Sequence, residues 1–523
     1  MASTCATSCA LVVFTLFLVL QWRRTKHSRL PLPPGPSKLP LVGNLFDVPA
    51  NYEWKTYAAW SRQYNSDIIH LNLAGTSIVV LSSVEATDAL LEKRSSIYSH
   101  RPRLPMLVEL MGWEFHVALM KYGARWRTYR RLLLQGIDAK ACISLRSKQL
   151  AATRSLLRAL LRTPERFTDH IRHSVGSTVI SVAYGIDVLP ENDPYIALGE
   201  ELMASALLGR FLVDFFPILK YLPDWVPGAG FKRVAKEGRK TMEAALNVPF
   251  EEVERQLRAA SGSALHSFTA TCLRALNDVE STNSNQENVN KQVYFDRQMI
   301  KDTAAVMYIG GLEPTTSVIS AFVLAMMANP EAQSKAQEEI DRALSEGTLP
   351  DFSDRDSGAL PYVEALIKEV LRWGCVGPKG VSHFLEVEDE YRGYRIPAGS
   401  IVIPNVWAIM NDETMYPNPG IFDPERFLLE GKLKRDILDP QLMFGFGRRI
   451  CPGRHLAADS LWLTIVSILA TFNITKAVGD DGKVIEPSYE FSSAVTSVPL
   501  SFRCSILPRS QSAQELVEGT ANV

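Results

Sequence analysis

A glycine-rich segment around one cysteine restricts this chain more than any other feature of its sequence. It runs from Phe444 to Gly453 as FGFGRRICPG. Glycines on both sides of Cys451 let the backbone turn tightly, so that the sulfur can face a ligand and receive backbone N–H groups. The neighbouring Arg449 favours a thiolate. The segment predicts a cysteine that binds a ligand, and the alternative for any single cysteine is a buried structural thiol.

The remaining cysteines indicate no competing chemistry. The chain has 7 of them, an odd number at irregular spacings, which does not make a disulfide framework and indicates a reducing compartment. His455 lies four residues after Cys451, but no Cys-x-x-Cys precedes it. The spacing of a zinc site is therefore not met.

Composition excludes several classes of protein. The 56 Lys and Arg balance 57 Asp and Glu, which argues against nucleic-acid binding through bulk positive charge. With 31 Gly and 30 Pro in 523 residues, collagen-like and low-complexity chains are excluded. The length alone would suggest about three to four domains. The sequence shows no internal repeat and no long low-complexity linker, so we expect one large domain.

The first 29 residues predict a membrane anchor. Thr4 to Trp22 carries no charge, and Ala10 to Leu20 reads ALVVFTLFLVL. Nineteen residues at about 1.5 Å each span roughly 28 Å, enough to cross a bilayer core. The basic residues follow the apolar run, which argues against a cleaved signal peptide and predicts that the remaining chain faces the cytosol. The alternative is a buried core helix.

The periodicity predicts a mainly α domain with small peripheral β-sheets. After the anchor at 1–29 we expect a stiff Pro-rich hinge at 30–44, because each proline fixes its own φ and disfavours helix before it. The large domain then covers 45–508, and a polar tail covers 509–523. We expect helices at 123–135, 296–328, 330–344, 362–373 and 455–472, and strands at 68–73, 78–81, 384–394 and 400–404.

The segment around Cys451 also carries a family resemblance. Its pattern F-x-x-G-x-R-x-C-x-G, met by Phe444, Gly447, Arg449, Cys451 and Gly453, resembles the haem-thiolate signature of the cytochrome P-450 family. The resemblance covers essentially the whole chain and is strongest to fungal microsomal members, such as those acting on aflatoxin precursors or on tryptamine. It implies a cytochrome P-450 fold behind one transmembrane helix, with Cys451 as the axial iron ligand of haem b.

Further motifs follow in the order of that family. Glu369 and Arg372 form its E-x-x-R pair, three residues apart on one helix face, and Arg426 resembles the arginine that joins them in a buried network. This network is structural rather than catalytic, because removing one member strands an unpaired charge.

The resemblance also implies the partners of the haem propionates. Trp126 and Arg130 match a W-x-x-x-R motif, and His383 and Arg449 occupy the places of further donors. Guanidinium groups pair well with carboxylates. The alternative for Arg130 is a solvated helix face, because three other arginines surround it: Arg125, Arg127 and Arg131.

One position departs from the family pattern. The family usually delivers protons through an acid followed directly by threonine in its long distal helix, but here Pro314 follows Glu313. Proline removes both the alcohol and a backbone N–H. Three outcomes remain open. Thr315 substitutes, a water or a substrate hydroxyl relays protons from Glu313, or the chain is an isomerase or dehydratase that does not activate O₂.

We expect a monooxygenase that inserts one oxygen atom from O₂ into an apolar, polycyclic or aromatic secondary metabolite or xenobiotic. A non-catalytic haem protein is the remaining alternative. The chain has no nucleotide-binding glycine loop, so electrons must come from NADPH through a separate protein, by resemblance the NADPH-cytochrome P-450 reductase of the endoplasmic reticulum membrane. A basic docking face for it is expected from Arg125, Arg127, Arg131, Arg448 and Arg454. Pocket walls are expected at 101–115, 206–215, 306–310 and 493–498.

Overall fold

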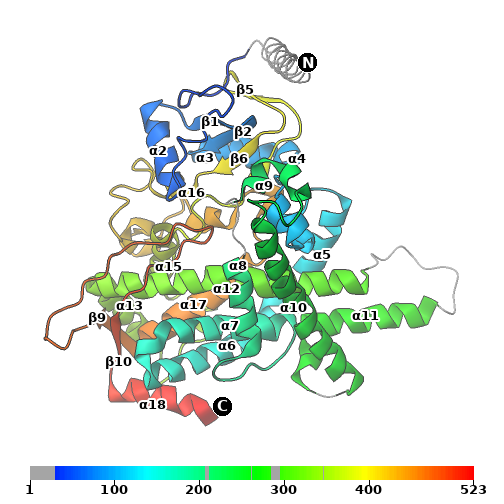
Figure 1. Cartoon of the computed structure of the whole chain (residues 1–523). Helices are drawn as coiled ribbons and strands as arrows, with labels where there is room; N and C mark the ends of the chain where they lie inside the picture. The colour runs from blue at the N-terminus through cyan, green and yellow to red at the C-terminus, as the bar shows by residue number, and fades with distance from the viewer. Residues whose placement is uncertain (1–29, 206–210, 261, 284–294, 346, 523) are drawn as a thin grey trace, which may run out of the picture.

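One long helix, α12 (Arg297–Ala328), runs through the middle of the molecule (Figure 1). The computed structural model describes residues 30–205, 211–260, 262–283, 295–345 and 347–522. Asp296 begins α12, because its side chain accepts a hydrogen bond from the Met299 N–H. The helix is long and apolar enough to cross a membrane, but 72% of its most apolar stretch is buried inside the protein. It is therefore the central core helix.

The C-terminal half of α12 packs in a large helical cluster. Trp462 and Phe322 are among its fully buried side chains. The cluster is formed by α6 (Ala139–Arg162), α7 (Phe167–Ala183), α13 (Pro330–Ala343), α15 (Pro361–Gly374) and α17 (Arg454–Thr471). The sequence predicted three of these helices, α13, α15 and α17, and no observed end differs from the expected one by more than one residue.

The N-terminal half of α12 packs in a second cluster. The helices that pack with it there include α5 (Ala124–Ile137), α8 (Pro194–Ser205), α10 (Phe231–Arg258) and α11 (Phe268–Asn283). Tyr308 of α12 and Met242 of α10 are buried in this cluster, together with Val117 of the loop before α5.

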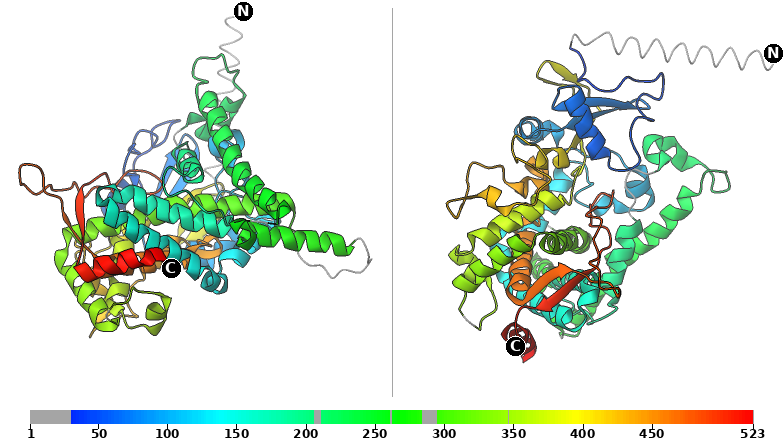
Figure 2. Two further views of the ribbon diagram at one scale, coloured as in Figure 1. Left: turned by 90° about the horizontal axis from the view of Figure 1, so that it is seen from below. Right: turned by 90° about the vertical axis from the view of Figure 1, so that its left-hand side faces the viewer.

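A four-stranded sheet lies at one end of the molecule. Its order is β1 (Ile68–Leu73), β2 (Thr76–Leu81), β6 (Ile401–Pro404) and β3 (His383–Phe384), with β2 and β6 parallel and the other pairs antiparallel. Figures 1 and 2 place this sheet, with α2 (Glu53–Gln63), at the end opposite to α18 (Gln511–Gly519). The three predicted strands at 68–73, 78–81 and 400–404 are thus confirmed.

The prediction of one strand at 384–394 is wrong. The chain leaves the sheet after β3, and β4 (Asp389–Tyr391) pairs with β5 (Tyr394–Ile396) in a separate hairpin. The turn between them consists of Arg392 and Gly393, both at positive φ, which is the geometry of a tight two-residue hairpin loop. Two further small sheets pair β9 (Phe472–Lys476) with β10 (Cys504–Pro508), and β7 (Leu428–Leu429) with β8 (Lys432–Leu433).

Short helical segments connect these elements. The α-helical ones are α3 (Val84–Thr87), α4 (Ser95–Tyr98), α9 (Leu212–Phe215), α14 (Phe352–Ser357) and α16 (Val406–Met410). The 3₁₀ and π segments are η1 (Asp88–Lys93), η2 (Pro105–Leu110), η3 (Trp113–Phe115), η4 (Pro164–Arg166), η5 (Pro217–Tyr221), η6 (Ser263–His266), η7 (Pro424–Phe427), η8 (Pro440–Phe444), η9 (Gly447–Arg449) and η10 (Thr520–Asn522).

The predicted fold class, mainly α with small peripheral sheets, is confirmed. The expected anchor at 1–29 lies outside the described residues. Within 30–44 the chain lies against the sheet, because Pro34 accepts a hydrogen bond of 2.9 Å from the His70 N–H. Within 509–523 the chain forms α18, whose Val517 is buried. The division into anchor, hinge, large domain and tail stays a prediction.

Candidate functional site

The loop before α17 holds Cys451 in a shape that only glycine permits. The Cys451 N–H donates to the Phe444 carbonyl at 2.7 Å, which closes the loop. Gly447 has a φ of +54°, and a Cβ there would lie 2.2 Å from the Leu91 carbonyl oxygen. Its N–H donates to Glu92 Oε1 at 2.5 Å. Any larger residue at position 447 would therefore push the loop away from η1.

The thiol of Cys451 lies in a setting with opposing influences. Burial raises its pKa, whereas the backbone N–H groups of Gly453 and Arg454 and the charges of Arg130 and Arg454 lower it. Groups that donate to sulfur and positive charges nearby both favour the thiolate. A positive ligand at the sulfur would add to them and complete the stabilisation of the anion.

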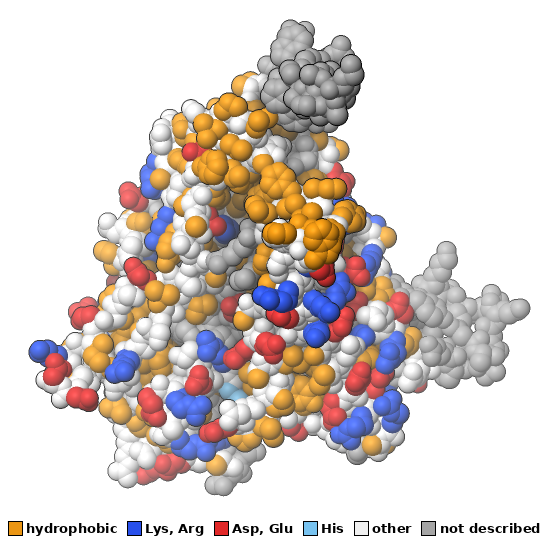
Figure 3. All heavy atoms as spheres, in the orientation of Figure 1, with side chains coloured by type: hydrophobic (Ala, Val, Ile, Leu, Met, Phe, Trp, Pro, Cys, Tyr) orange, Lys and Arg blue, Asp and Glu red, His pale blue; other side chains and the backbone are white. Residues whose placement is uncertain are grey.

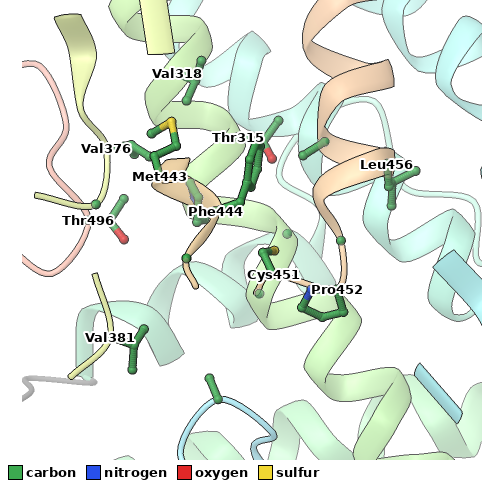
Figure 4. A pocket seen from close by; sticks show the side chains of 18 of the residues that line it. Thr315, Val318, Val376, Val381, Met443, Phe444, Cys451, Pro452, Leu456 and Thr496 are labelled. Carbon is green, nitrogen blue, oxygen red and sulfur yellow. The ribbon is translucent and has the colours of Figure 1, made fainter. Parts of the chain in front are cut away.

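A cavity of about 400 Å³ extends from Cys451 to α12. Figure 4 shows Thr315 and Val318 of α12 bordering the same space as Cys451, with Val376, Val381 and Thr496 entering from other loops. Most of the lining side chains are apolar. Beyond the residues labelled in Figure 4 they include Val117, Leu133, Val306 and Met307.

Three arginines line one part of this cavity without an acidic partner. Arg101 and Arg449 are buried and donate only to backbone carbonyls, at 2.6 to 3.0 Å, while Arg130 donates to the Ile450 carbonyl at 2.5 Å. Burial lowers the pKa of all three guanidinium groups. No ion pair joins any of them to a carboxylate in the described part of the chain. Buried positive charge of this kind requires an anion.

The neighbouring Trp126 completes this group. Its ring lies 4.5 Å from the Arg449 guanidinium, and its buried Nε1–H has no hydrogen-bond partner in the described residues. A buried N–H without an acceptor costs stability unless a ligand supplies one. Three cations and an orphan donor together form a site for an anionic ligand.

His383 lies at the same cavity with a different hydrogen-bonding pattern. Its Nδ1 lies 2.8 Å from the Tyr98 carbonyl, to which it can only donate. Burial, with the nearby charges of Arg101 and Arg449, lowers its pKa well below the ordinary value. The neutral ring therefore offers Nε2 as an acceptor. It can donate from that atom only after gaining a proton, which an anion in the cavity would favour.

The segment around Pro314 places its side chains on different sides of α12. Pro314 and Thr315 line the cavity, and the Thr315 hydroxyl has no hydrogen-bond partner in the described residues. The hydroxyl of the next residue, Thr316, donates to the Leu312 carbonyl at 2.8 Å. Glu313 lies outside the cavity lining. Burial raises its pKa, and a hydrogen bond with the Thr496 hydroxyl lowers it.

The three network residues lie together beside the site. Glu369 accepts hydrogen bonds from Arg372 at 2.7 Å and from Arg426 at 3.2 Å. Both arginines also donate to the Ile421 carbonyl. All three side chains are buried, so the Glu369 carboxylate and the backbone carbonyls together stabilise the two guanidinium groups in place of water.

Sequence reasoning missed two polar residues of the cavity. Arg101 was included only as the first residue of an expected pocket wall, because His100-Arg101-Pro102-Arg103 contains two arginines that nothing in the sequence distinguishes. His116 lies one residue beyond that wall and lines the cavity. The expected wall at 206–215 is not found in the described chain, because residues 206–210 lie outside it and residues 211–215 do not line the cavity. The expected wall at 493–498 contributes Val495 and Thr496.

Comparison with known proteins identifies the site. The family model described as cytochrome P-450 matches residues 33–502. The chain belongs to the cytochrome P-450 family. It is 43% identical over 501 residues to cytochrome P-450 monooxygenase ple1 of Rhodocybe pseudopiperita, covering 95% of this chain and 92% of that protein. It is 40% identical over 503 residues to tryptamine 4-monooxygenase of Psilocybe cyanescens, covering 95% and 96%.

This P-450 chain is thus an oxidoreductase of the monooxygenase class, and the cofactor of its family is thiolate-ligated haem b. The residues fit that cofactor. Haem b carries two carboxylates, which match the three arginines without acid partners and the orphan Nε1–H of Trp126. Its iron is positive and binds a thiolate. At the other part of the cavity, nearby N–H groups and positive charges favour the thiolate form of Cys451.

Proposed function

We propose that this enzyme inserts one oxygen atom from O₂ into an apolar, polycyclic or aromatic secondary metabolite or xenobiotic. The observation that carries the proposal is the cavity between Cys451 and α12, which is lined mainly by apolar side chains and has Thr315 on its α12 wall (Figure 4). Apolar walls favour an apolar substrate by removing its surface from water. One relative is named for tryptamine, which has an aromatic ring system.

Cys451 would bind the haem iron through its thiolate. Haem b supplies the O₂ chemistry when bound, and a thiolate ligand favours O–O cleavage. Phe444 closes the loop around Cys451 through its carbonyl. Trp126, Arg130 and Arg449 would hold the propionates together with Arg101, and His383 would join this group after gaining a proton.

Thr315 and Glu313 deliver protons to the cavity. Thr315 faces the cavity, and this supports its taking the place of the hydroxyl that Pro314 cannot supply. Pro314 also lacks the N–H that would bond to the carbonyl of Gly310, another cavity residue, so this carbonyl can accept from a water. Glu313, whose pKa is raised by burial, exchanges protons through the Thr496 hydroxyl.

Electrons come from NADPH through NADPH-cytochrome P-450 reductase. The exposed side chains of Arg125, Arg127, Arg131 and Arg448, with the partly exposed Arg454, support a basic docking face on the Cys451 side. Such a face attracts an acidic partner and raises its rate of association.

The enzyme is a single-pass protein of the endoplasmic reticulum membrane, with residues 1–29 as anchor and the catalytic domain in the cytosol. A patch of exposed hydrophobic side chains supports this location. Figure 3 shows such side chains gathered over α9. Phe215 and Val48 pack against the same cluster of buried sheet residues, and so the two segments that form the patch lie over the same part of the core. Its exposed members are Leu39, Leu41, Phe46, Leu212, Phe216, Ile218, Tyr221 and Trp225. Contiguous patches of this kind mark surfaces that contact a membrane or a partner.

The test is O₂ consumption by the purified holoenzyme with the reductase and a bound substrate. We expect consumption that depends on NADPH and reductase, with an oxygenated product. Turnover of a hydroperoxide without either would overturn the proposal and indicate an isomerase or dehydratase.

A further inference from the structure

His116 presents an unpaired hydrogen-bond donor to the cavity. It lies on the loop between η3 and α5, next to Val117, and both residues line the cavity. The imidazole packs against the rings of Trp113 and Phe115, with centroids 5.6 and 6.1 Å away. These two ring contacts hold the half-buried imidazole in place at the cavity wall.

The position of the imidazole proton follows from one backbone contact. The Ala118 N–H donates to His116 Nδ1 at 3.3 Å, and a backbone N–H can only donate, so Nδ1 carries no proton. Burial lowers the pKa of His116 to about 4, which keeps the ring neutral near pH 7. The proton is therefore on Nε2. This N–H has no hydrogen-bond partner in the described residues.

An uncharged acceptor suits this donor best. The anionic groups of the cofactor would be held by Arg101, Arg130 and Arg449, as proposed above, and so would not need His116. A neutral N–H among apolar side chains is left unsatisfied by a pure hydrocarbon and is satisfied by a carbonyl, ether or hydroxyl oxygen. The cost of leaving it unpaired is what allows one such residue to discriminate between substrates.

We propose that His116 is a specificity-determining residue that donates from Nε2 to an oxygen atom of the substrate. The substrates of the enzyme are then apolar ring systems that already carry one oxygen acceptor. The inference rests on the proposed function, because it assumes that the cavity takes an organic substrate.

The test compares two probes of one ring system, fluorene and 9-fluorenone, by calorimetric titration of the holoenzyme. We expect the wild-type enzyme to bind 9-fluorenone about fivefold more tightly than fluorene, the effect of one net hydrogen bond. The ratio falls to about one in His116→Phe, which keeps an aromatic ring without the donor. It rises again in His116→Gln, which restores an N–H. In Val117→Ala, which changes the cavity wall without changing the donor, the ratio stays at the wild-type value.

A wild-type ratio near one, or the same ratio in His116→Phe as in the wild type, would overturn the proposal. Loss of bound haem from His116→Phe alone would also overturn it, because His116 would then serve the cofactor. Calorimetry does not depend on thiolate ligation. A wild-type enzyme that lacks the carbon monoxide spectrum of a haem-thiolate would therefore overturn the proposed function and not this inference.

Discussion

The guanidinium of Arg372 donates two hydrogen bonds of 2.7 Å to the carboxylate of Glu369, and neither side chain has any exposed surface. The same carboxylate also accepts from the Asp423 N–H at 2.8 Å and from Arg426. One carboxylate therefore joins α15 to the segment around η7. Its loss would strand two buried cations at once.

We predict that Glu369→Gln destabilises the fold by about 3 to 5 kcal/mol, the usual cost of removing one partner of a buried ion pair. The measurement is the urea midpoint of the holoenzyme, followed by far-UV circular dichroism. Lys93→Ala is the control, since Lys93 pairs with Asp88 on the surface, and we expect its midpoint to equal that of the wild type. A wild-type midpoint for Glu369→Gln would contradict the structural role.

We predict that Thr315→Val uncouples NADPH use from oxygen insertion. The variant removes the hydroxyl at the cavity, so the rate of product formation should fall by about a hundredfold, in the range of lost acid-base catalysis. Thr316→Val is the matched control, because its hydroxyl is bonded to the Leu312 carbonyl instead. The measurement is hydrogen peroxide released per NADPH oxidised. Equal ratios for the two variants would mean that Thr315 carries no protons.

We predict that reversing charge on the proposed docking face slows electron delivery. The double variant Arg127→Glu with Arg448→Glu should lower the rate of haem reduction by the reductase by about tenfold at low salt, and less at high salt. Arg162→Glu, at the far end of α6, serves as the control. If the double variant keeps the wild-type rate at low salt, the docking face lies elsewhere.

We predict that the exposed patch binds lipid without the anchor. A protein lacking residues 1–29 should still float with phosphatidylcholine vesicles, and changing Ile218, Tyr221 and Trp225 to serine should weaken this binding by at least about tenfold. The paired control changes Leu429 and Leu507, which are exposed to a similar degree on β7 and β10, to serine. Equal flotation of both variants would show that the patch does not contact the membrane.

The sequence predicted the elements whose signals are local. The periodicity at 296–328 located α12 to within one residue. The predicted tight turn around Cys451 is explained at one glycine by the close approach of Gly447 to Leu91. The hairpin after β3 had a local signal that went unused, the pair Arg392-Gly393. The helix α18 likewise follows a serine cap, at Ser510.

The rest of the site depends on contacts between distant parts of the chain. Nothing near Arg101 in the sequence shows that it is buried beneath the Val381 carbonyl, whereas Arg103 pairs with Glu109 at the surface. His116 looks like any loop histidine until the cavity is known. The placement of Thr315 beside the cavity, with Glu313 facing Thr496, also requires the three-dimensional position of the loop that carries Thr496.

The reduced carbon monoxide difference spectrum tests the central claim most directly, because its Soret band depends on the atom that binds the iron opposite to carbon monoxide. We predict the band of a haem-thiolate for the wild-type enzyme and for the control Cys504→Ser. We predict a band shifted to that of a nitrogen-ligated haem, or loss of haem, for Cys451→His. A haem-thiolate band that persists in Cys451→His would show that another cysteine binds the iron, and it would contradict the assignment of Cys451.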